Sequence, residues 1–187
     1  MVYQMTKPEE YAIRFGRPLD IPNLIAADRA ASELFRPTGL VPDMATIPES
    51  IPVPVLTDAL NAGMVLVATH EDTAIGFALC QIFGTYLYLH QLSVAPEHGR
   101  KGIGRELVQR VFLLAENNKC HCIALSTFRE VPWNAPFYAS LGFKELPAKK
   151  RAAWMLEIEQ EQSKTLDITK RCFMRRPVRR PLRSRFL

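Results

Sequence analysis

The sequence predicts a single α/β (α+β) domain built on a mixed sheet of seven strands, flanked by three or four helices. A chain of 187 residues that is 48% hydrophobic can bury a sizeable core. Short apolar runs of strand character alternate with segments of helical periodicity, and no internal repeat interrupts them. We therefore expect one domain over residues 1–160, followed by a basic, flexible C-terminal tail over 161–187.

The N-terminal third predicts a strand, a helix and a long irregular connection. Apolar residues alternate with Ala12 and Arg14 across 11–15, which is the pattern of a strand. Asp20 can cap a following helix whose apolar face runs to residue 35. Prolines and a glycine then punctuate residues 37–54, and a connection of this length is usually functional or disordered. A short helix over 55–61 closes the region.

The rest of the chain predicts strands around one central unit. A hairpin around Glu71 and Asp72 precedes that unit, and a helix stopped by Gly142 follows it. The expected strands are 64–69, 74–83, 86–94, 122–127, 143–146 and 153–158, the last two as a pair, and the expected helix is 134–141.

The central unit is a strand, a glycine-bearing loop and an amphipathic helix. The strand from Tyr86 ends before Pro96, and apolar residues recur at helical spacing from Leu107 to Ala115. A helix N-terminus leaves backbone N–H groups unpaired and attracts phosphate. The loop glycines allow close approach of an anion, and the basic side chains add positive charge. The predicted phosphate site comprises Gly99, Arg100, Lys101, Gly102, Ile103, Gly104 and Arg105.

Two common phosphate motifs do not fit this loop. A nucleotide-triphosphate P-loop requires Lys and then Ser or Thr after its last glycine, where this chain has Arg105 and Glu106. A dinucleotide-binding loop requires a third glycine at the position of Leu107.

The order of motifs resembles the acyl-coenzyme A binding core of the GNAT superfamily of N-acetyltransferases. The shared features are a strand ending in LxV, the GxG loop, the amphipathic helix and PFYxxxGF at 136–143, and the resemblance covers roughly residues 11–159. Gly99 stands where the family usually has Gln or Arg, and Arg100 follows one place later. The resemblance implies the GNAT fold with a mostly antiparallel sheet, acetyl-CoA as co-substrate, and a loop that holds the pyrophosphate.

The resemblance also implies roles for individual residues. The backbone of Leu92, Ser93 and Val94 would hold the pantetheine arm and the thioester. Asn134 would bond a pantetheine amide or, alternatively, cap its helix. Tyr138 would protonate the departing thiolate, since a phenol with a pKa near 10 stays protonated at neutral pH; otherwise it is a core tyrosine.

His90 is the candidate general base. Residues 88–94 resemble the HLHxLAV strand of the arylalkylamine N-acetyltransferases, where histidines assist deprotonation of the amine. His90 matches the second histidine and Tyr88 replaces the first. An imidazole accepts a proton at neutral pH, although a single histidine in a strand also has a purely structural interpretation.

The cysteines and the chain start predict a cytoplasmic protein without a metal. Four cysteines form no CxxC pair, and Cys120-His121-Cys122 lacks a second ligand pair. A reducing compartment fits free thiols. The first residues lack the apolar region of a signal peptide, and no apolar run reaches the roughly 18 residues that span a bilayer.

The first functional hypothesis is an N-acetyltransferase that acts on a small primary amine by direct attack in a ternary complex; the alternative acceptor is a protein N-terminus or lysine. A different class is a non-catalytic acyl-CoA binder.

The tail suggests a third class, weak contact with nucleic acid or an anionic surface. Residues 170–187 contain eight basic side chains, and subtracting these from the net charge of +5 leaves −3 for the rest of the chain. We expect the tail to be dispensable for stability and catalysis. The oligomeric state is open and includes a homodimer.

Overall fold

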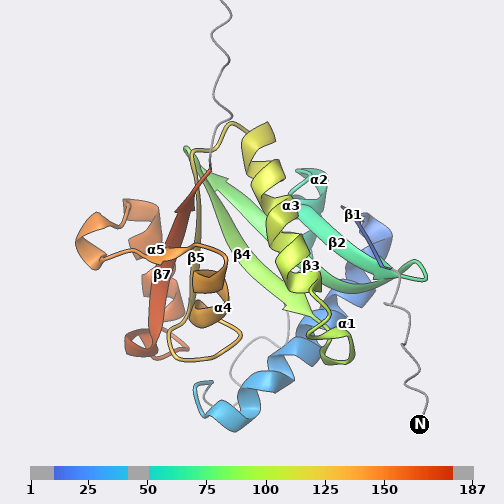
Figure 1. The fold of residues 1–187 in the computed structure, drawn as a ribbon, viewed down its shortest axis with the longest axis horizontal. Coiled ribbons are helices and arrows are strands. Elements are labelled where there is room, and N and C mark those ends of the chain that lie inside the picture. Colours follow the sequence, from blue (N-terminus) through green and yellow to red (C-terminus); the bar gives the residue numbers. More distant parts are fainter. Residues whose placement is uncertain (1–10, 42–50, 179–187) are drawn as a thin grey trace, which may run out of the picture.

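A computed structural model describes residues 11–41 and 51–178 and contains one seven-stranded sheet (Figure 1). The strand order is β1-β2-β3-β4-β5-β7-β6, and every neighbouring pair is antiparallel except β4 with β5. The predicted mixed sheet of seven strands is confirmed. The strands are β1 Ala12–Phe15, β2 Val65–His70, β3 Thr73–Phe83, β4 Tyr86–Val94, β5 Cys122–Phe128, β6 Lys144–Glu145 and β7 Arg171–Pro177.

Helices cover both faces of the sheet. We call the side that carries α3 and α4 the α3 face, and the side that carries α1, α2 and α5 the α1 face; α3 and α4 lie in front of the sheet in Figure 1. None of the described helices is long and apolar enough to cross a membrane. The helices are α1 Ile21–Ser32, α2 Val53–Asn61, α3 Ile103–Asn117, α4 Ala135–Ser140 and α5 Ala153–Gln162, with short 3-10 turns η1 Pro18–Asp20, η2 Glu33–Thr38, η3 Pro96–His98, η4 Ala148–Lys150 and η5 Ile168–Lys170.

Helical periodicity in the sequence builds the core of the α3 face. Leu107, Val111 and Leu114 of α3 lie on one side of the helix and pack against buried residues of β4 and β5, including Leu87 and Ile123. Full burial of each such side chain stabilises the fold by about 1.5–3 kcal/mol relative to exposure. This packing fixes the start of α3 at the end of β4.

The parallel strands β4 and β5 separate soon after they meet. Tyr86 to Tyr88 pair with Cys122 to Ala124, and no pairing continues beyond them. β4 remains bonded to β3 and β5 remains bonded to β7, so the two halves of the sheet diverge toward the lower part of Figure 1. One edge of β4 beyond Tyr88 therefore has no strand partner.

A bulge in β4 lies at the point where the strands separate. Leu79 pairs with Gln91 and Cys80 pairs with Leu89, so His90 is the additional residue. A bulge changes which residues share a face of the sheet. As a result Tyr88 and Gln91 both lie toward the α1 face, although three positions separate them.

The prediction of a strand over 153–158 is wrong, because this segment belongs to helix α5. Six residues with mixed apolar and acidic character do not distinguish a helix from a strand by periodicity alone. Met155 is buried under the sheet while Glu157 and Glu161 are exposed. The described residues therefore contain five α-helices rather than three or four, and β6 pairs with β7 instead of with 153–158.

The prediction that a flexible tail begins at residue 161 is also wrong for the described part of it. β7 lies between β5 and β6, and Cys172, Phe173 and Met174 are buried. The domain therefore extends at least to Val178, beyond the predicted boundary at 160. The arginines of this segment suggested a solvated tail, although the residues between them form a strand. The remaining tail, 179–187, and residues 42–50 of the predicted irregular connection lie outside the described residues.

Candidate acyl-transfer site

The glycine loop between β4 and α3 has the conformation of an anion-binding helix start. Gly102 has a φ of +88°, which favours glycine, and Arg100 has a φ of +59°. The N–H of Glu106 donates to the carbonyl of Gly102 at 3.0 Å, which is the first bond of α3. The amides of residues 103–105 precede that bond and have no acceptor within the helix. Arg100, Lys101 and Arg105 are exposed around them, whereas the side chain of Ile103 is buried.

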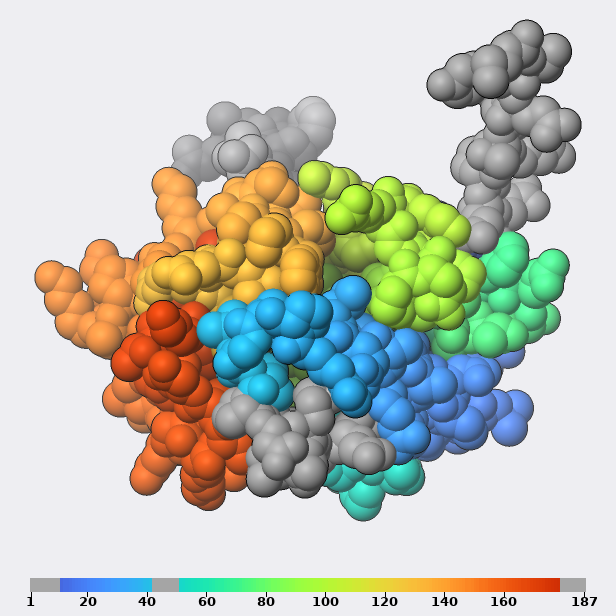
Figure 2. Space-filling model, turned by 90° about the horizontal axis from the view of Figure 1, so that it is seen from below, coloured from blue at the N-terminus to red at the C-terminus, as the bar shows by residue number. Residues whose placement is uncertain are grey.

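Three elements that carry predicted site residues converge at Gly104. A Cβ at Gly104 would lie 3.8 Å from Phe137 of α4, and 4.0 Å from both Leu92 and Val94 of β4. Three segments therefore meet at Gly104: the glycine loop, the end of β4 and the start of α4. The motifs of the sequence predicted that these segments form one site. Figure 2 shows a hollow at this side of the molecule, between the lime-green segment around α3 and the orange segment around α4.

The unpaired edge of β4 offers backbone groups to a ligand. Leu92, Ser93 and Val94 pair with β3 on one side and face the opening toward β5 on the other. Backbone N–H groups without a partner can stabilise negative charge that develops on a carbonyl oxygen. The Ser93 side chain points instead to the α1 face, where its hydroxyl donates to Asp28 at 2.7 Å. Only the backbone of Ser93 is therefore available to the opening.

Tyr138 lies on the α3 face, in α4, with its side chain buried. Burial raises the pKa of Tyr138 above its ordinary value, and the neighbouring Tyr88 and Cys80 add to the shift. The phenol therefore stays protonated at neutral pH. Within the described residues, its hydroxyl has no hydrogen-bond partner, so its proton is available to a ligand.

Asn134 precedes α4 and does not cap the helix with its side chain. Its Oδ1 instead accepts a hydrogen bond of 2.5 Å from the Thr127 hydroxyl at the end of β5. This bond ties the start of α4 to the strand on the far side of the opening. The side-chain amide N–H groups have no acceptor in the described part of the chain.

His90 lies at the bulge and is exposed on the α1 face, apart from Tyr138 and the glycine loop on the other side of β4. It forms part of the wall of a pocket of about 590 Å³ between α2 and β3. Protein atoms around one side of the imidazole partly desolvate it, which lowers the pKa of His90, while the carboxylate of Asp28 partly opposes this shift. The ring is therefore neutral at pH 7 and can accept a proton.

Asp28 is a residue of the site that the sequence prediction missed. Its carboxylate is 5% exposed and accepts hydrogen bonds from Gln91 at 2.8 Å and Ser93 at 2.7 Å. Burial raises the pKa of Asp28, and these two bonds oppose the shift. A signal exists in the sequence: Asp28 lies four residues after the buried Leu24, on the inward side of α1.

The described residues hold no group of three His, Cys, Asp or Glu side chains that could bind a metal ion. Cys120 and Cys122 are buried, and both lie in the apolar packing beside the strands rather than around a shared site. No role for a metal is proposed here.

Part of this chain is similar to a known protein family. Residues 61–145 match the family model described as acetyltransferase (GNAT) domain. The matched segment runs from the end of α2 to β6 and includes the bulge, the glycine loop and α4.

Several solved structures share the fold. PaiA N-acetyltransferase from Thermoplasma acidophilum, in complex with coenzyme A, is 19% identical over 90% of this chain and 99% of its own, with a TM-score of 0.70. Ribosomal-protein-S18-alanine N-acetyltransferase from Escherichia coli is 16% identical over 95% and 100% of the two chains, with a TM-score of 0.64. N-acetylglutamate synthase from Neisseria gonorrhoeae, complexed with coenzyme A and N-acetyl-glutamate, is 15% identical over 93% of this chain and 36% of its own, at 0.69.

These structures establish the GNAT fold for this chain, as the resemblance of its motifs implied. The match of residues 61–145 to an acetyltransferase domain and the shared fold support an acyltransferase enzyme. The finer resemblance, to the arylalkylamine branch, has no counterpart among these matches and remains a prediction.

Proposed function

We propose that this protein transfers an acetyl group from acetyl-CoA to a primary amine of a small molecule, by direct attack in a ternary complex. The observation that carries the proposal is the convergence at Gly104 of the glycine loop, the unpaired edge of β4 and the start of α4. A coenzyme on this side would reach the opening between β4 and β5, and the amine would approach from the α1 face.

The residues on the α3 side suit the coenzyme. The amides of 103–105 and the side chains of Arg100, Lys101 and Arg105 would bind the pyrophosphate. The backbone of Leu92, Ser93 and Val94, with the Asn134 amide, would hold the pantetheine arm and polarise the thioester carbonyl. Coenzyme A bound in several proteins of this fold is consistent with acetyl-CoA as co-substrate.

Two groups on opposite sides of β4 would transfer protons. His90 would take the proton of the incoming ammonium, directly or through water, because its lowered pKa keeps the imidazole neutral. Tyr138 would donate its proton to the departing thiolate, because its raised pKa keeps the phenol protonated. Positions on opposite faces allow the base to act on the amine and the acid to act on the coenzyme.

The cysteines favour direct attack over a covalent acetyl-enzyme. Cys80, Cys120, Cys122 and Cys172 are all buried. Burial raises the pKa of each of these thiols, so none is a thiolate at neutral pH. The thiolate is the nucleophilic form of cysteine, and none of these side chains is therefore prepared to accept the acetyl group.

Packing over the α1 face favours a small acceptor over a polypeptide. The ring of Phe35 in η2 lies 5.5 Å from that of Phe128 in β5 and 5.8 Å from that of Trp133. The α1–η2 segment, blue to cyan in Figure 2, thus crosses from one half of the sheet to the other. A protein N-terminus or lysine remains the alternative, since the fold also serves a ribosomal-protein acetyltransferase.

A screen of amines and peptides, followed by release of the coenzyme A thiol, tests the proposal. We expect turnover on small amines, and loss of that turnover in Tyr138→Phe without loss of acetyl-CoA affinity. Turnover only on peptides would favour the alternative. Acetyl-CoA binding by calorimetry without turnover on any acceptor would indicate a non-catalytic acyl-CoA binder, and absence of binding would contradict both.

A further inference from the structure

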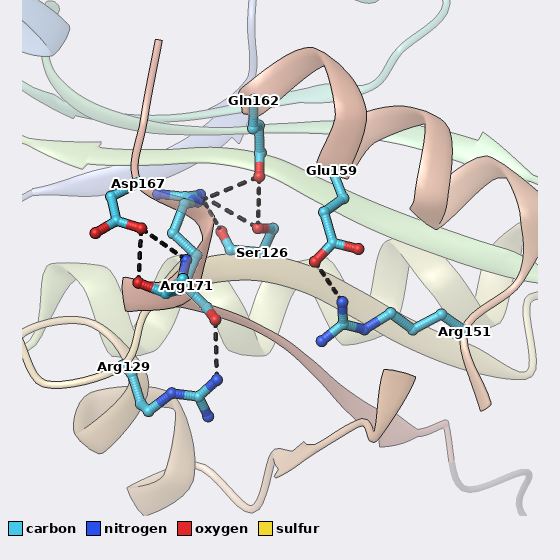
Figure 3. Close-up of polar contacts among 8 residues, drawn as sticks. Ser126, Arg129, Arg151, Glu159, Gln162, Asp167 and Arg171 are labelled. Atoms are coloured by element: carbon cyan, nitrogen blue, oxygen red, sulfur yellow. Dashed lines mark hydrogen bonds and ion pairs between the residues drawn. The ribbon is translucent and has the colours of Figure 1, made fainter. Parts of the chain in front are cut away.

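Arg171 is a half-buried arginine on the α1 face, at the start of β7. It pairs with Phe128 across the ladder, and Phe173, two residues later, packs with Tyr88 on the same face. The sequence prediction placed Arg171 in a solvated tail. Its guanidinium instead lies beside Gln162 at the end of α5 and Ser126 of β5 (Figure 3).

Neutral groups hold this guanidinium in place. Its Nε donates to Gln162 Oε1 at 3.2 Å, and its Nη2 donates to the carbonyl and the hydroxyl of Ser126 at 3.1 and 3.3 Å. The Ser126 hydroxyl in turn donates to Gln162 at 2.8 Å, and the Arg171 Cζ lies 4.6 Å from the centre of the Phe128 ring. The side chain is therefore fixed in orientation while Nη1 has no acceptor among the described residues.

Arg171 lacks the acidic partner that several other described arginines have. Arg14 pairs with Asp20 at 2.7 Å, and Arg129 and Arg151 pair with Glu145 and Glu159. Within residues 11–41 and 51–178, no carboxylate forms an ion pair with Arg171. A partly buried charge is costly to fold unless an opposite charge compensates it.

The uncompensated charge faces the region assigned to the acceptor. Tyr88 lies between Arg171 and His90: its ring centre is 5.9 Å from that of His90, and the positive charge of Arg171 acts directly on its hydroxyl. The Phe128 ring, which lies under the Arg171 guanidinium, also contacts the ring of Phe35 at 5.5 Å. Arg171 and His90 thus lie on the two sides of Tyr88, on the same face of the sheet.

We infer that Arg171 binds a carboxylate of the acceptor, so that the substrate is an amino acid or another carboxylated amine rather than a purely cationic amine. The inference rests on the proposed function. The guanidinium is fixed by bonds from Nε and Nη2, so its Nη1 N–H groups can donate a charge-assisted hydrogen bond to a carboxylate. Ser126 and Gln162 position Arg171 for this contact.

The test compares matched acceptors with and without the carboxylate. The twenty amino acids and their amides are screened with wild type, and the best acid–amide pair is then measured with Arg171→Gln and Arg171→Lys. We expect kcat/KM for the acid to fall about 10- to 100-fold in Arg171→Gln while kcat/KM for the amide changes by less than about threefold. Arg171→Lys should fall between, since it keeps the charge and loses the fork.

Arg129→Gln is the matched control. Arg129 follows β5 and lies beside the start of β7, where its Nη2 donates to the Arg171 carbonyl at 3.0 Å, but its charge is already paired with Glu145. The acid-to-amide ratio should stay at the wild-type value in this variant. Comparison of each variant with wild type on the same acceptor cancels the different pKa values of the two amines.

Three outcomes would overturn the inference. Equal losses on acid and amide would show that Arg171 only supports the sheet, and a raised KM for acetyl-CoA would place it in the coenzyme site. If no acceptor turns over, the proposed function fails separately, and calorimetry of the coenzyme A-loaded protein with the N-acetylated amino acids decides the inference. Binding that Arg171→Gln weakens at least tenfold would support a carboxylate site; no binding would exclude it.

Discussion

The two faces of the sheet differ in how their residues are brought together. On the α3 face, apolar side chains at helical spacing pack on alternate residues of β4 and β5, and the glycine loop follows directly from β4. On the α1 face, buried polar contacts join residues far apart in the chain, such as Asp28 with Ser93 and Ser126 with Arg171.

This difference shows which side of the proposed site depends on local sequence and which side depends on tertiary contacts. The proposed coenzyme side lies on the α3 face and consists mainly of one continuous stretch of sequence, so local motifs predict it. The proposed acceptor side combines α1, β4, β5 and β7, so it depends on tertiary contacts. Removal of β7, which packs on both faces, is expected to have the strongest effect on stability.

Truncation after Lys170 should have the largest effect. It removes β7, whose Cys172 and Met174 pack on the α3 face and whose Phe173 packs on the α1 face. Burial of each contributes about 1.5–3 kcal/mol, and unfolding free energies are only about 5–15 kcal/mol. We expect no cooperative thermal transition by circular dichroism.

Truncation after Val178 is the control, because it removes basic residues without removing β7. Its thermal midpoint should stay within a few degrees of wild type. The earlier expectation that the region from 170 onward is dispensable would be restored if both truncations behaved alike.

Tyr138→Phe and Tyr88→Phe compare one buried tyrosine on each face. Loss of a positioned acid lowers turnover by about 10²–10⁴-fold, so we expect a fall in kcat of at least about 100-fold for Tyr138→Phe. Tyr88→Phe should lower kcat by less than about tenfold, since its hydroxyl lies among Arg171, Gln162 and Ser126. Steady-state kinetics with acetyl-CoA affinity as the control distinguishes them; similar losses would remove the acid role of Tyr138.

His90→Gln should change the pH dependence of the reaction. In wild type, log kcat/KM should rise with pH through a group that titrates below the ordinary histidine value near 6.5, because protonated His90 cannot act as a base. The variant should lose this acid limb and about tenfold or more in plateau rate. Superimposable pH profiles would make His90 a structural strand residue.

Asp28→Asn should shift the acid limb of the pH profile and stabilise the fold. The negative charge of Asp28 favours the protonated form of His90, so removal of this charge should shift the acid limb to still lower pH. Because burial raises the pKa of Asp28, the folded state holds the proton more tightly than the unfolded state. The charged carboxylate therefore costs stability as pH rises above about 4. At pH 7 a rise of a few degrees in Tm is expected, and a fall would show that the hydrogen bonds to Gln91 and Ser93 outweigh burial.

Substitutions in the glycine loop are expected to have the smallest effects, which are on acetyl-CoA affinity. Gly102→Ala places a Cβ where φ is +88°, at a cost of about 1–2 kcal/mol, and should weaken acetyl-CoA binding about five- to tenfold. Gly104→Ala meets its neighbours at ordinary contact distance and should change affinity less than about twofold. Gly104→Val, with two further methyl groups, should crowd Phe137 and Leu92. Calorimetry measures all three, and equal affinities would remove the phosphate site from this loop.

Local sequence patterns predicted the fold class, and they are also the basis of the proposed coenzyme side. The hairpin around Glu71 and Asp72, the strand before Pro96 and the helix from Ile103 follow from period, proline and glycine, which act over a few residues. The same local rules marked the glycine loop and the segment that contains Tyr138.

The formation of β7, the helical conformation of α5 and the proposed acceptor side depend on tertiary contacts that no local pattern in the sequence predicts. Whether 153–162 is a helix depends on Met155 packing under Phe173, and whether 171–177 is a strand depends on a free edge of β5. Asp28 and Arg171 acquire their environments from partners 65 and 45 positions away. Pairing at that separation has no local period, so the helical position of Asp28 can indicate an inward-facing side chain but neither residue's partners can be read from the sequence.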